Sequence, residues 1–131
     1  MQHFIKKSLL LSCSLFLFGC ATSNQAIERK NYHSWENDIG YSQVVKTHNT
    51  LYISGITSEE TTFENQIDDI YNTIKKILAD YDVGTNAIVK EVIFTTDIEK
   101  AKAAIPTRKA HFNDKYPSSS WIEVKRLWSK S

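Results

Sequence analysis

Histidine and serine side chains could carry out chemistry in this chain, but neither type forms a catalytic or metal-binding pattern. His33, His48 and His111 lie far apart and have no Asp or Glu at the spacing of a metal site. The serines at 118–120 lack the Gly-x-Ser-x-Gly elbow that presents a nucleophile. We therefore expect no metal site, and we expect the histidines to be exposed or to cap helices.

The cysteines point to a modification and not to catalysis. Cys13 lies in an apolar stretch, residues 8–18, that follows Lys6 and Lys7. This stretch is far shorter than the roughly 20 residues that a membrane-spanning helix needs. It therefore indicates the apolar centre of a signal peptide.

Residues 17–20 (LFGC) resemble the lipobox of bacterial lipoproteins, where the cysteine is lipidated and the chain is cut just before it. After such a cut Cys20 is the only remaining thiol, and a lone thiol in an oxidising compartment is reactive unless it is modified. We expect a lipoprotein signal peptide at 1–19 and a lipid anchor with palmitate on Cys20. An ordinary signal peptide with a chance cysteine is the alternative. Ala21 after the cysteine favours the periplasmic side of the outer membrane in a Gram-negative cell envelope.

The charge balance argues against a nucleic-acid partner. Lys and Arg number 16 against 15 Asp and Glu, which gives a net charge of +1. Loss of Lys6 and Lys7 with the signal peptide would leave 14 basic against 15 acidic side chains, a net charge of −1. Proteins bind polyanions through a basic patch or stripe, which this sequence lacks.

Length and composition predict one domain behind a tether. The 131 residues suffice for one ordinary domain and not for two. Residues 20–36 are polar and have no apolar period, so we expect a tether that follows the lipidated cysteine. Tyr32 and Trp35 near its end are expected to dock on the domain, which we place at 37–131.

An amphipathic helix is the clearest element of this domain. Apolar residues recur at helical spacing from Phe63 to Tyr81, which places them on one face. Thr61 followed by Glu64 predicts a capping box at the start of the helix. Gly84 is expected to end it.

Strands and a second helix complete an α/β pattern. The strands are predicted at 41–46, 51–56, 88–95 and 121–127, with a turn of the first hairpin at 47–50. Asp97 is expected to cap a second helix that runs to about residue 113, with a kink or restart at Pro106. The order β-β-α-β-α-β implies a sheet with both helices on one face. The other face would expose apolar side chains and therefore needs a partner.

These elements carry a resemblance to the RidA/YjgF family. The similarity covers about residues 36–128 and rests on blocks at 40–46 (GYSQVVK), 51–55 (LYISG), 82–97 (DVGTNAIVKEVIFTTD) and 112–127 (FNDKYPSSSWIEVKRL). It implies a chorismate-mutase-like fold and a homotrimer that covers the open sheet face. The family's ligand clefts lie between subunits, and its best-known members hydrolyse enamines and imines to 2-keto acids and ammonia without metal or cofactor.

The resemblance assigns site residues only where this sequence matches. Tyr41 matches the family's pocket Tyr and Ser54-Gly55 its pocket Ser-Gly, so Tyr41 and Ser54 are catalytic candidates and all three are ligand candidates. Ser119 stands where the family has an Arg that clamps the substrate carboxylate. Trp121 replaces a small pocket residue, so both positions are expected to line the ligand site. The family's catalytic Glu lies on a final strand beyond the end of this sequence.

Two functions stay open. In the first, the protein is an envelope-anchored, divergent or non-catalytic module that binds a small, uncharged metabolite in the clefts between subunits. In the second, it is a hydrolase similar to 2-iminobutanoate/2-iminopropanoate deaminases with an altered carboxylate site. Ser119 and Trp121 favour the first. The missing Arg and final strand indicate either an Arg-lacking subgroup of the family or a shortened chain.

Overall fold

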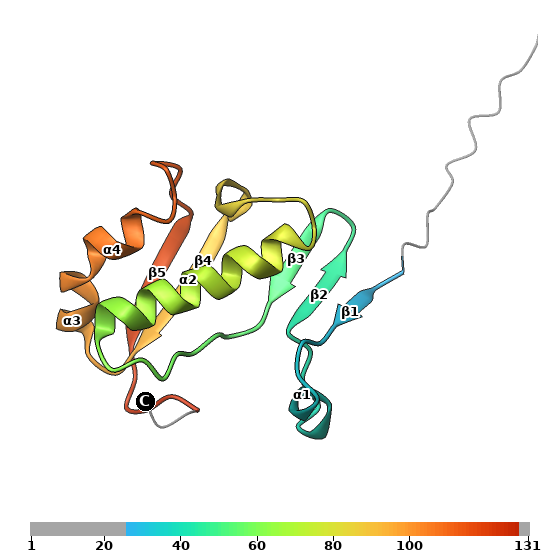
Figure 1. Ribbon diagram of the computed structural model, residues 1–131, viewed down its shortest axis with the longest axis horizontal. Helices are drawn as coiled ribbons and strands as arrows, with labels where there is room; N and C mark the ends of the chain where they lie inside the picture. The colour runs from blue at the N-terminus through green and yellow to red at the C-terminus, as the bar shows by residue number, and fades with distance from the viewer. Residues whose placement is uncertain (1–25, 129–131) are drawn as a thin grey trace, which may run out of the picture. The chain divides into compact units, whose positions relative to one another are not determined.

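A three-stranded sheet organises the first of two compact units in this computed structural model, which describes residues 26–128 (Figure 1). Its elements are β1 (Glu28–Lys30), α1 (Trp35–Asp38), β2 (Val44–Thr47) and β3 (Thr50–Ile53). The strands are ordered β1-β2-β3, and β1 runs antiparallel to β2 with Arg29 opposite Val45. The predicted hairpin is present, but its turn is the pair His48-Asn49, with His48 at a φ of 53°.

The predicted tether, residues 20–36, contains ordered structure in the part that is described. Strand β1 pairs with β2, and Trp35 begins α1 and stacks on Tyr41 with ring centroids 5.8 Å apart. An edge strand that carries charged side chains has no apolar alternation, which explains why Glu28–Lys30 was not predicted as a strand. The signal peptide and Cys20 lie outside the described residues.

The second unit, residues 53–131, is an α/β layer in which helices cover one face of a parallel strand pair. Its elements are α2 (Phe63–Ala79), the 3-10 turn η1 (Thr85–Ala87), β4 (Lys90–Thr95), α3 (Ile98–Ala103), α4 (Ile105–Lys109) and β5 (Ser118–Glu123). Strand β4 lies parallel to β5, with Glu91 opposite Ser119 and Ile93 opposite Trp121. The last strand therefore begins earlier than the predicted 121–127, because its serines pair with the start of β4.

The second predicted helix is two helices. It breaks at Ala104, and Pro106 lies in the first turn of α4, where its missing N–H costs no hydrogen bond. The restart predicted at Pro106 is thus confirmed. The helical part ends at Lys109 and not near residue 113.

The helix stripe predicted from the sequence forms the core of the second unit. Ile67 and Tyr71 of α2 pack with Ala104 and Phe112, and the rings of Tyr71 and Phe112 meet edge to face with centroids 5.2 Å apart. The opposite face of the strand pair exposes Val92, Phe94 and Ile122 at 46%, 53% and 42%. The expected uncovered apolar face is therefore present.

The ends of α2 differ from the prediction. Thr62, not Thr61, is the N-cap, and its hydroxyl accepts a hydrogen bond from the Asn65 N–H at 3.3 Å. At the other end Asp82, not Gly84, takes the left-handed conformation, with a φ of 56°. Val83 N–H donates to Leu78 O and Asp82 N–H to Ala79 O, the two bonds of a Schellman motif.

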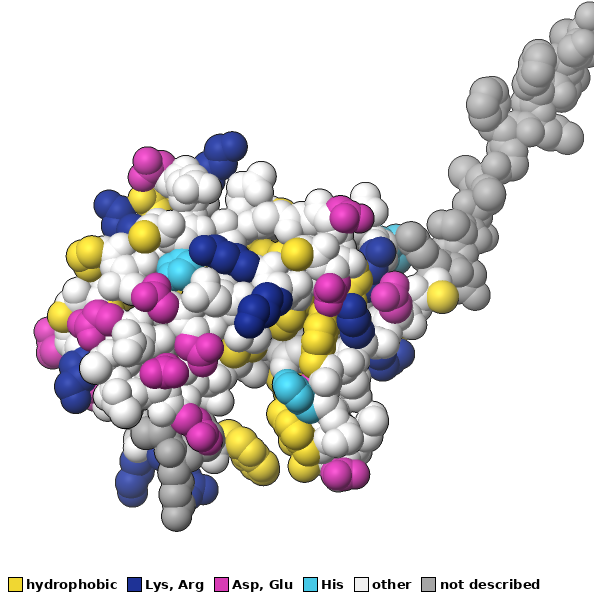
Figure 2. Space-filling model, in the orientation of Figure 1, with side chains coloured by type: hydrophobic (Ala, Val, Ile, Leu, Met, Phe, Trp, Pro, Cys, Tyr) yellow, Lys and Arg dark blue, Asp and Glu magenta, His cyan; other side chains and the backbone are white. Residues whose placement is uncertain are grey.

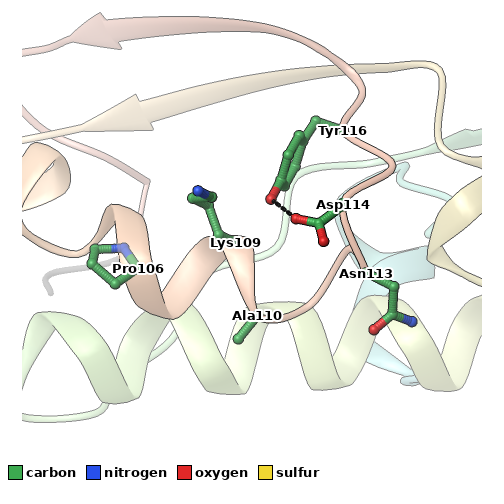
Figure 3. A pocket seen from close by; sticks show the side chains of 6 residues that line it. All are labelled: Pro106, Lys109, Ala110, Asn113, Asp114 and Tyr116. Carbon is green, nitrogen blue, oxygen red and sulfur yellow. Dashed lines mark hydrogen bonds between the residues drawn. The ribbon is translucent and has the colours of Figure 1, made fainter.

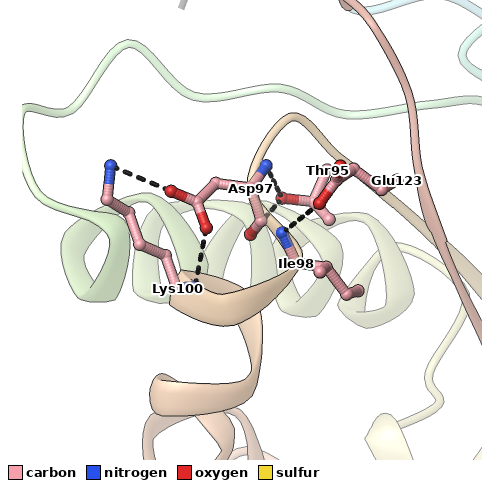
Figure 4. A network of polar contacts seen from close by, with 5 residues as sticks. All are labelled: Thr95, Asp97, Ile98, Lys100 and Glu123. Carbon is pink, nitrogen blue, oxygen red and sulfur yellow. Dashed lines mark hydrogen bonds and ion pairs between the residues drawn. The ribbon is translucent and has the colours of Figure 1, made fainter.

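Helix α3 begins as predicted. The Asp97 carboxylate accepts the Lys100 N–H at 3.0 Å, and this bond lowers the pKa of Asp97 (Figure 4). Glu123 of β5 accepts the Ile98 N–H at 2.9 Å and ties the helix start to the strand. Between residues 26 and 128, no helix is both long and apolar enough to cross a membrane.

Candidate functional site

The structure brings together two of the predicted ligand residues, Ser119 and Trp121 on β5. The Trp121 Nε1–H donates to Ser119 Oγ at 2.7 Å. Both residues lie on the strand face that the helices cover, since their β4 neighbours Glu91 and Ile93 are the half-buried positions of that strand. The Ser119 hydroxyl is thus engaged by an indole and carries no charge.

Tyr41 belongs to the first unit and sits in an aromatic stack. Its hydroxyl donates to Gln43 Oε1 at 3.2 Å, and its ring packs on Trp35. His33 stacks on Trp35 in turn, with centroids 6.0 Å apart and planes inclined by 10°. The sequence pointed to Tyr41 through the family resemblance, but it did not predict this stack.

A buried carboxylate fixes the segment that leads to Tyr41. Glu36 has no exposed surface, and its carboxylate accepts the N–H groups of Tyr32 and His33. The Glu36 carbonyl accepts the Tyr41 N–H at 2.8 Å. These bonds satisfy an otherwise costly buried charge, so Glu36 has a structural role.

Ser54 and Gly55 follow β3. Ser54 is half-buried and Gly55 is exposed. A Cβ added to Gly55 would meet no atom within 4 Å, so packing inside this chain does not require glycine there.

A buried charged network lies beside Ser119 and Trp121 and was not predicted. Arg108 Nη2 donates to Glu91 Oε1, and the Tyr71 hydroxyl donates to Glu91 Oε2 at 2.7 Å. The Arg108 and Glu91 side chains are only 8% and 12% exposed. The Arg108 guanidinium carbon lies 4.8 Å from the Phe112 ring centroid and 5.7 Å from that of Trp121.

Burial, and then the hydrogen bond to Glu91, raise the pKa of Tyr71. The phenol therefore keeps its proton and acts as a donor to the carboxylate. Glu91 lies 20 residues from Tyr71 and 17 from Arg108 in the chain. No local motif joins residues at such separations, so the sequence held no signal for the network.

His111 is buried, contrary to the prediction of an exposed or capping side chain. Its Nε2 is 2.8 Å from Asp68 Oδ1, and its ring stacks on Tyr71 with centroids 5.0 Å apart. Its carbonyl accepts the Thr85 hydroxyl at 2.8 Å. Nδ1 of His111 is buried and has no hydrogen-bond partner among the described residues.

A solvent-open depression of about 270 Å³ lies over the end of α4 (Figure 3). It is lined by Pro106, Lys109, Ala110, Asn113, Asp114 and Tyr116. The Tyr116 hydroxyl donates to Asp114 Oδ1 at 2.7 Å, and this bond raises the pKa of Tyr116. None of the predicted ligand residues lines the depression, and its openness does not suit a small ligand.

Charge on the surface is mixed. Figure 2 shows basic and acidic side chains interspersed on the face that α2 presents. Within the described part of the chain, no group of three or more His, Cys, Asp or Glu side chains is placed to hold a metal ion.

Comparison with protein families shows the family to which this chain belongs. The sequence profile of the family described as Endoribonuclease L-PSP, the RidA/YjgF family, matches residues 33–131. The chain belongs to this family. The match includes the aromatic stack of the first unit and all of the second unit.

Solved structures of similar proteins share the α/β fold. A YjgF-family protein of Mycobacterium tuberculosis is similar with a TM-score of 0.73 and 22% identity, over 79% of this chain and 89% of that one. RidA of an Antarctic Psychrobacter has a TM-score of 0.63 and 27% identity, over 67% and 77%. A putative endoribonuclease of Thermotoga maritima has a TM-score of 0.63 and 24% identity, over 67% and 76%. A search of curated proteins finds no match.

Proposed function

We propose that this RidA/YjgF-family chain is a lipid-anchored homotrimer whose intersubunit clefts bind a small metabolite without deaminating it. The observation that carries the proposal is the Ser119–Trp121 pair. At the position of the carboxylate-clamping Arg stands a hydroxyl that accepts an indole N–H at 2.7 Å. Neither side chain supplies the fork of charged donors that recognises a carboxylate.

The nearby cation does not replace that clamp. Arg108 lies over the Trp121 ring, but its Nη2 already donates to Glu91. A ligand carboxylate would bring a second negative charge next to Glu91 in a place that water reaches poorly. Such a site favours an uncharged ligand over the anionic enamines and imines that family members hydrolyse.

Exposed apolar side chains support a trimer. Val92, Phe94 and Ile122 lie on the strand face opposite the helices and are between 42% and 53% exposed. A contiguous apolar face of this kind is normally covered by another protein surface. In the proposed homotrimer, the other two copies of this chain would cover the apolar face.

The membrane anchor rests on Cys20 and the segment before it. A Cys20→Ala substitution should release the protein from the membrane fraction and abolish palmitate incorporation. Cys13→Ala, which changes the other cysteine, should leave both unchanged, because Cys13 lies in the apolar centre of the signal peptide. Fractionation with radiolabelled palmitate measures this, and a Cys20→Ala protein that stays labelled and membrane-bound would contradict the anchor.

The second candidate function is that of an enamine and imine deaminase. Family membership and the Tyr41 hydroxyl, which donates to Gln43 at 3.2 Å, favour it. Ser54 would then be a second catalytic candidate, and the products would be a 2-keto acid and ammonia. No cofactor is needed for either function.

Ammonia release from 2-aminoacrylate, generated in situ by a dehydratase, separates the two functions. The binding proposal predicts release at the background rate from the full-length trimer. Release above background that Tyr41→Phe abolishes would establish the deaminase instead. Tyr52→Phe is the matched control, because Tyr52 lies on the same unit and is 60% exposed.

A further inference from the structure

Arg108 is buried with one of its hydrogen-bond donors, the Nε–H, unused. The residue is 7% exposed, and its Nε is buried without a hydrogen-bond partner among residues 26–128. Buried polar groups in folded proteins are nearly always hydrogen-bonded, so such an atom needs an explanation.

The remaining contacts of Arg108 fix it rigidly. Its Nη2 donates a hydrogen bond to one carboxylate oxygen of Glu91, and the Tyr71 hydroxyl donates to the other. The Phe112 ring lies 4.8 Å from the guanidinium carbon. These contacts hold the guanidinium in place.

Two residues of the proposed ligand site lie next to this guanidinium. The Trp121 ring lies 5.7 Å from the guanidinium carbon, and the Ser119 hydroxyl holds the indole N–H. Trp121 is half-buried and Ser119 is exposed. Trp121 and its hydrogen bond to Ser119 thus lie next to Arg108.

We propose that Arg108 is the polar anchor of the ligand site and that its free Nε–H donates to a neutral carbonyl oxygen, as in an amide or a lactam. The inference rests on the proposed function, because it places the ligand beside Ser119 and Trp121. Arg108 and Glu91 form a neutral pair, so a neutral acceptor satisfies the free donor without adding charge. A carboxylate would face Glu91 unpaired, and like charges at such a distance repel strongly away from water. Glu91 is therefore the residue that sets the specificity.

Nuclear magnetic resonance of the arginine side chains tests this directly. The sequence has three arginines, Arg29, Arg108 and Arg126, so a full-length protein with ¹⁵N-labelled arginine gives few Nε–H signals. Loss of one signal in Arg108→Lys assigns it. Acetamide and acetate are the probes, because they have the same shape and differ in charge. The exposed Arg29 and Arg126 are internal controls.

In the wild type, acetamide should shift the Arg108 signal saturably and bind about tenfold more tightly than acetate. Glu91→Gln should reverse this order, since acetate then meets an unpaired guanidinium. Glu60→Gln, on an exposed residue of the same unit, should keep the wild-type order. The signals of Arg29 and Arg126 should show no saturable shift.

If acetamide does not shift the Arg108 signal in the folded wild type, the inference is overturned, regardless of the result for Glu91→Gln. A wild type that prefers acetate would overturn it as well. Light scattering on the same sample separates this failure from that of the proposed function. A monomer contradicts the proposed trimer, whereas a trimer whose Arg108 ignores acetamide contradicts only the role of Arg108.

Discussion

At the scale of single residues, Tyr71, Glu91 and Arg108 form a buried charged network that links α2, β4 and α4. The sequence placed Tyr71 on the buried face of its helix, because apolar periodicity reports burial. It did not place Glu91 or Arg108 in the interior, because charged residues are expected outside unless they are paired. The pairing depends on how α2, α4 and β4 pack, and no local pattern encodes that.

The Tyr71 hydroxyl gives the network a signature in the pH dependence of stability. Burial and the bond to Glu91 raise the pKa of Tyr71 in the folded protein above its ordinary value of 10.0. As the pH rises above this value, the unfolded chain loses the proton first, so the free energy of unfolding falls by up to about 1.4 kcal/mol per pH unit. Below pH 10 the contribution of Tyr71 is fully present.

Tyr71→Phe should remove this part of the decline, and Tyr52→Phe should keep it. Urea unfolding between pH 9 and 11 measures the slopes. Equal slopes for the wild type and Tyr71→Phe would show that the phenol proton does not stabilise the folded state.

At the scale of elements, local chemistry predicted the centres of helices and strands better than their ends. The apolar stripe predicted α2 correctly, and Pro106 predicted the restart that separates α3 from α4. The prediction that α2 ends at Gly84 was wrong. Glycine is the usual residue in the left-handed conformation at a helix end, whereas Asp82 takes that conformation here. The start of β5 was missed because its serines have weak strand preference and follow the pairing with β4.

The left-handed conformation at Asp82 predicts an unusual response to glycine. Asp82→Gly should leave the free energy of unfolding unchanged or raise it by up to about 1 kcal/mol, because glycine adopts this conformation without strain. Asp80→Gly, two residues earlier at a φ of −64°, should lower it by roughly 0.3 kcal/mol, because Asp ranks only slightly above Gly in helix propensity. Thermal or urea unfolding compares the two, and an equal loss from both would contradict the Schellman motif.

At the scale of the whole molecule, the sequence predicted the α/β fold and an uncovered strand face, but it predicted one sheet where the structure has two, β1-β2-β3 and β4-β5. The face follows from the element order, since the helices between consecutive strands pack on one side of the strand pair. The arrangement of the ligand residues could not be predicted in the same way. Tyr41 and Trp121 belong to different units, and the proposed cleft needs a second copy of the chain.

A charge in the middle of the uncovered face tests the trimer. Phe94→Glu should produce a folded monomer, because a carboxylate cannot be buried against a second copy without a partner. Val89→Glu, at a residue that is 79% exposed just before β4, should remain a trimer. Light scattering with circular dichroism distinguishes a monomer from an unfolded chain. A Phe94→Glu protein that stays trimeric would place the interface elsewhere.

The most direct test of the account is the rate of ammonia release from 2-aminoacrylate by the full-length protein. The Ser119 hydroxyl accepts a hydrogen bond from the Trp121 indole, and Arg108 donates a hydrogen bond to Glu91. Neither residue is therefore available to bind the substrate carboxylate. We therefore predict a rate equal to that of the uncatalysed reaction, for the wild type and for Tyr41→Phe alike. A wild-type rate clearly above this background, lost in Tyr41→Phe and kept in Tyr52→Phe, would contradict the binding function and identify the protein as a deaminase.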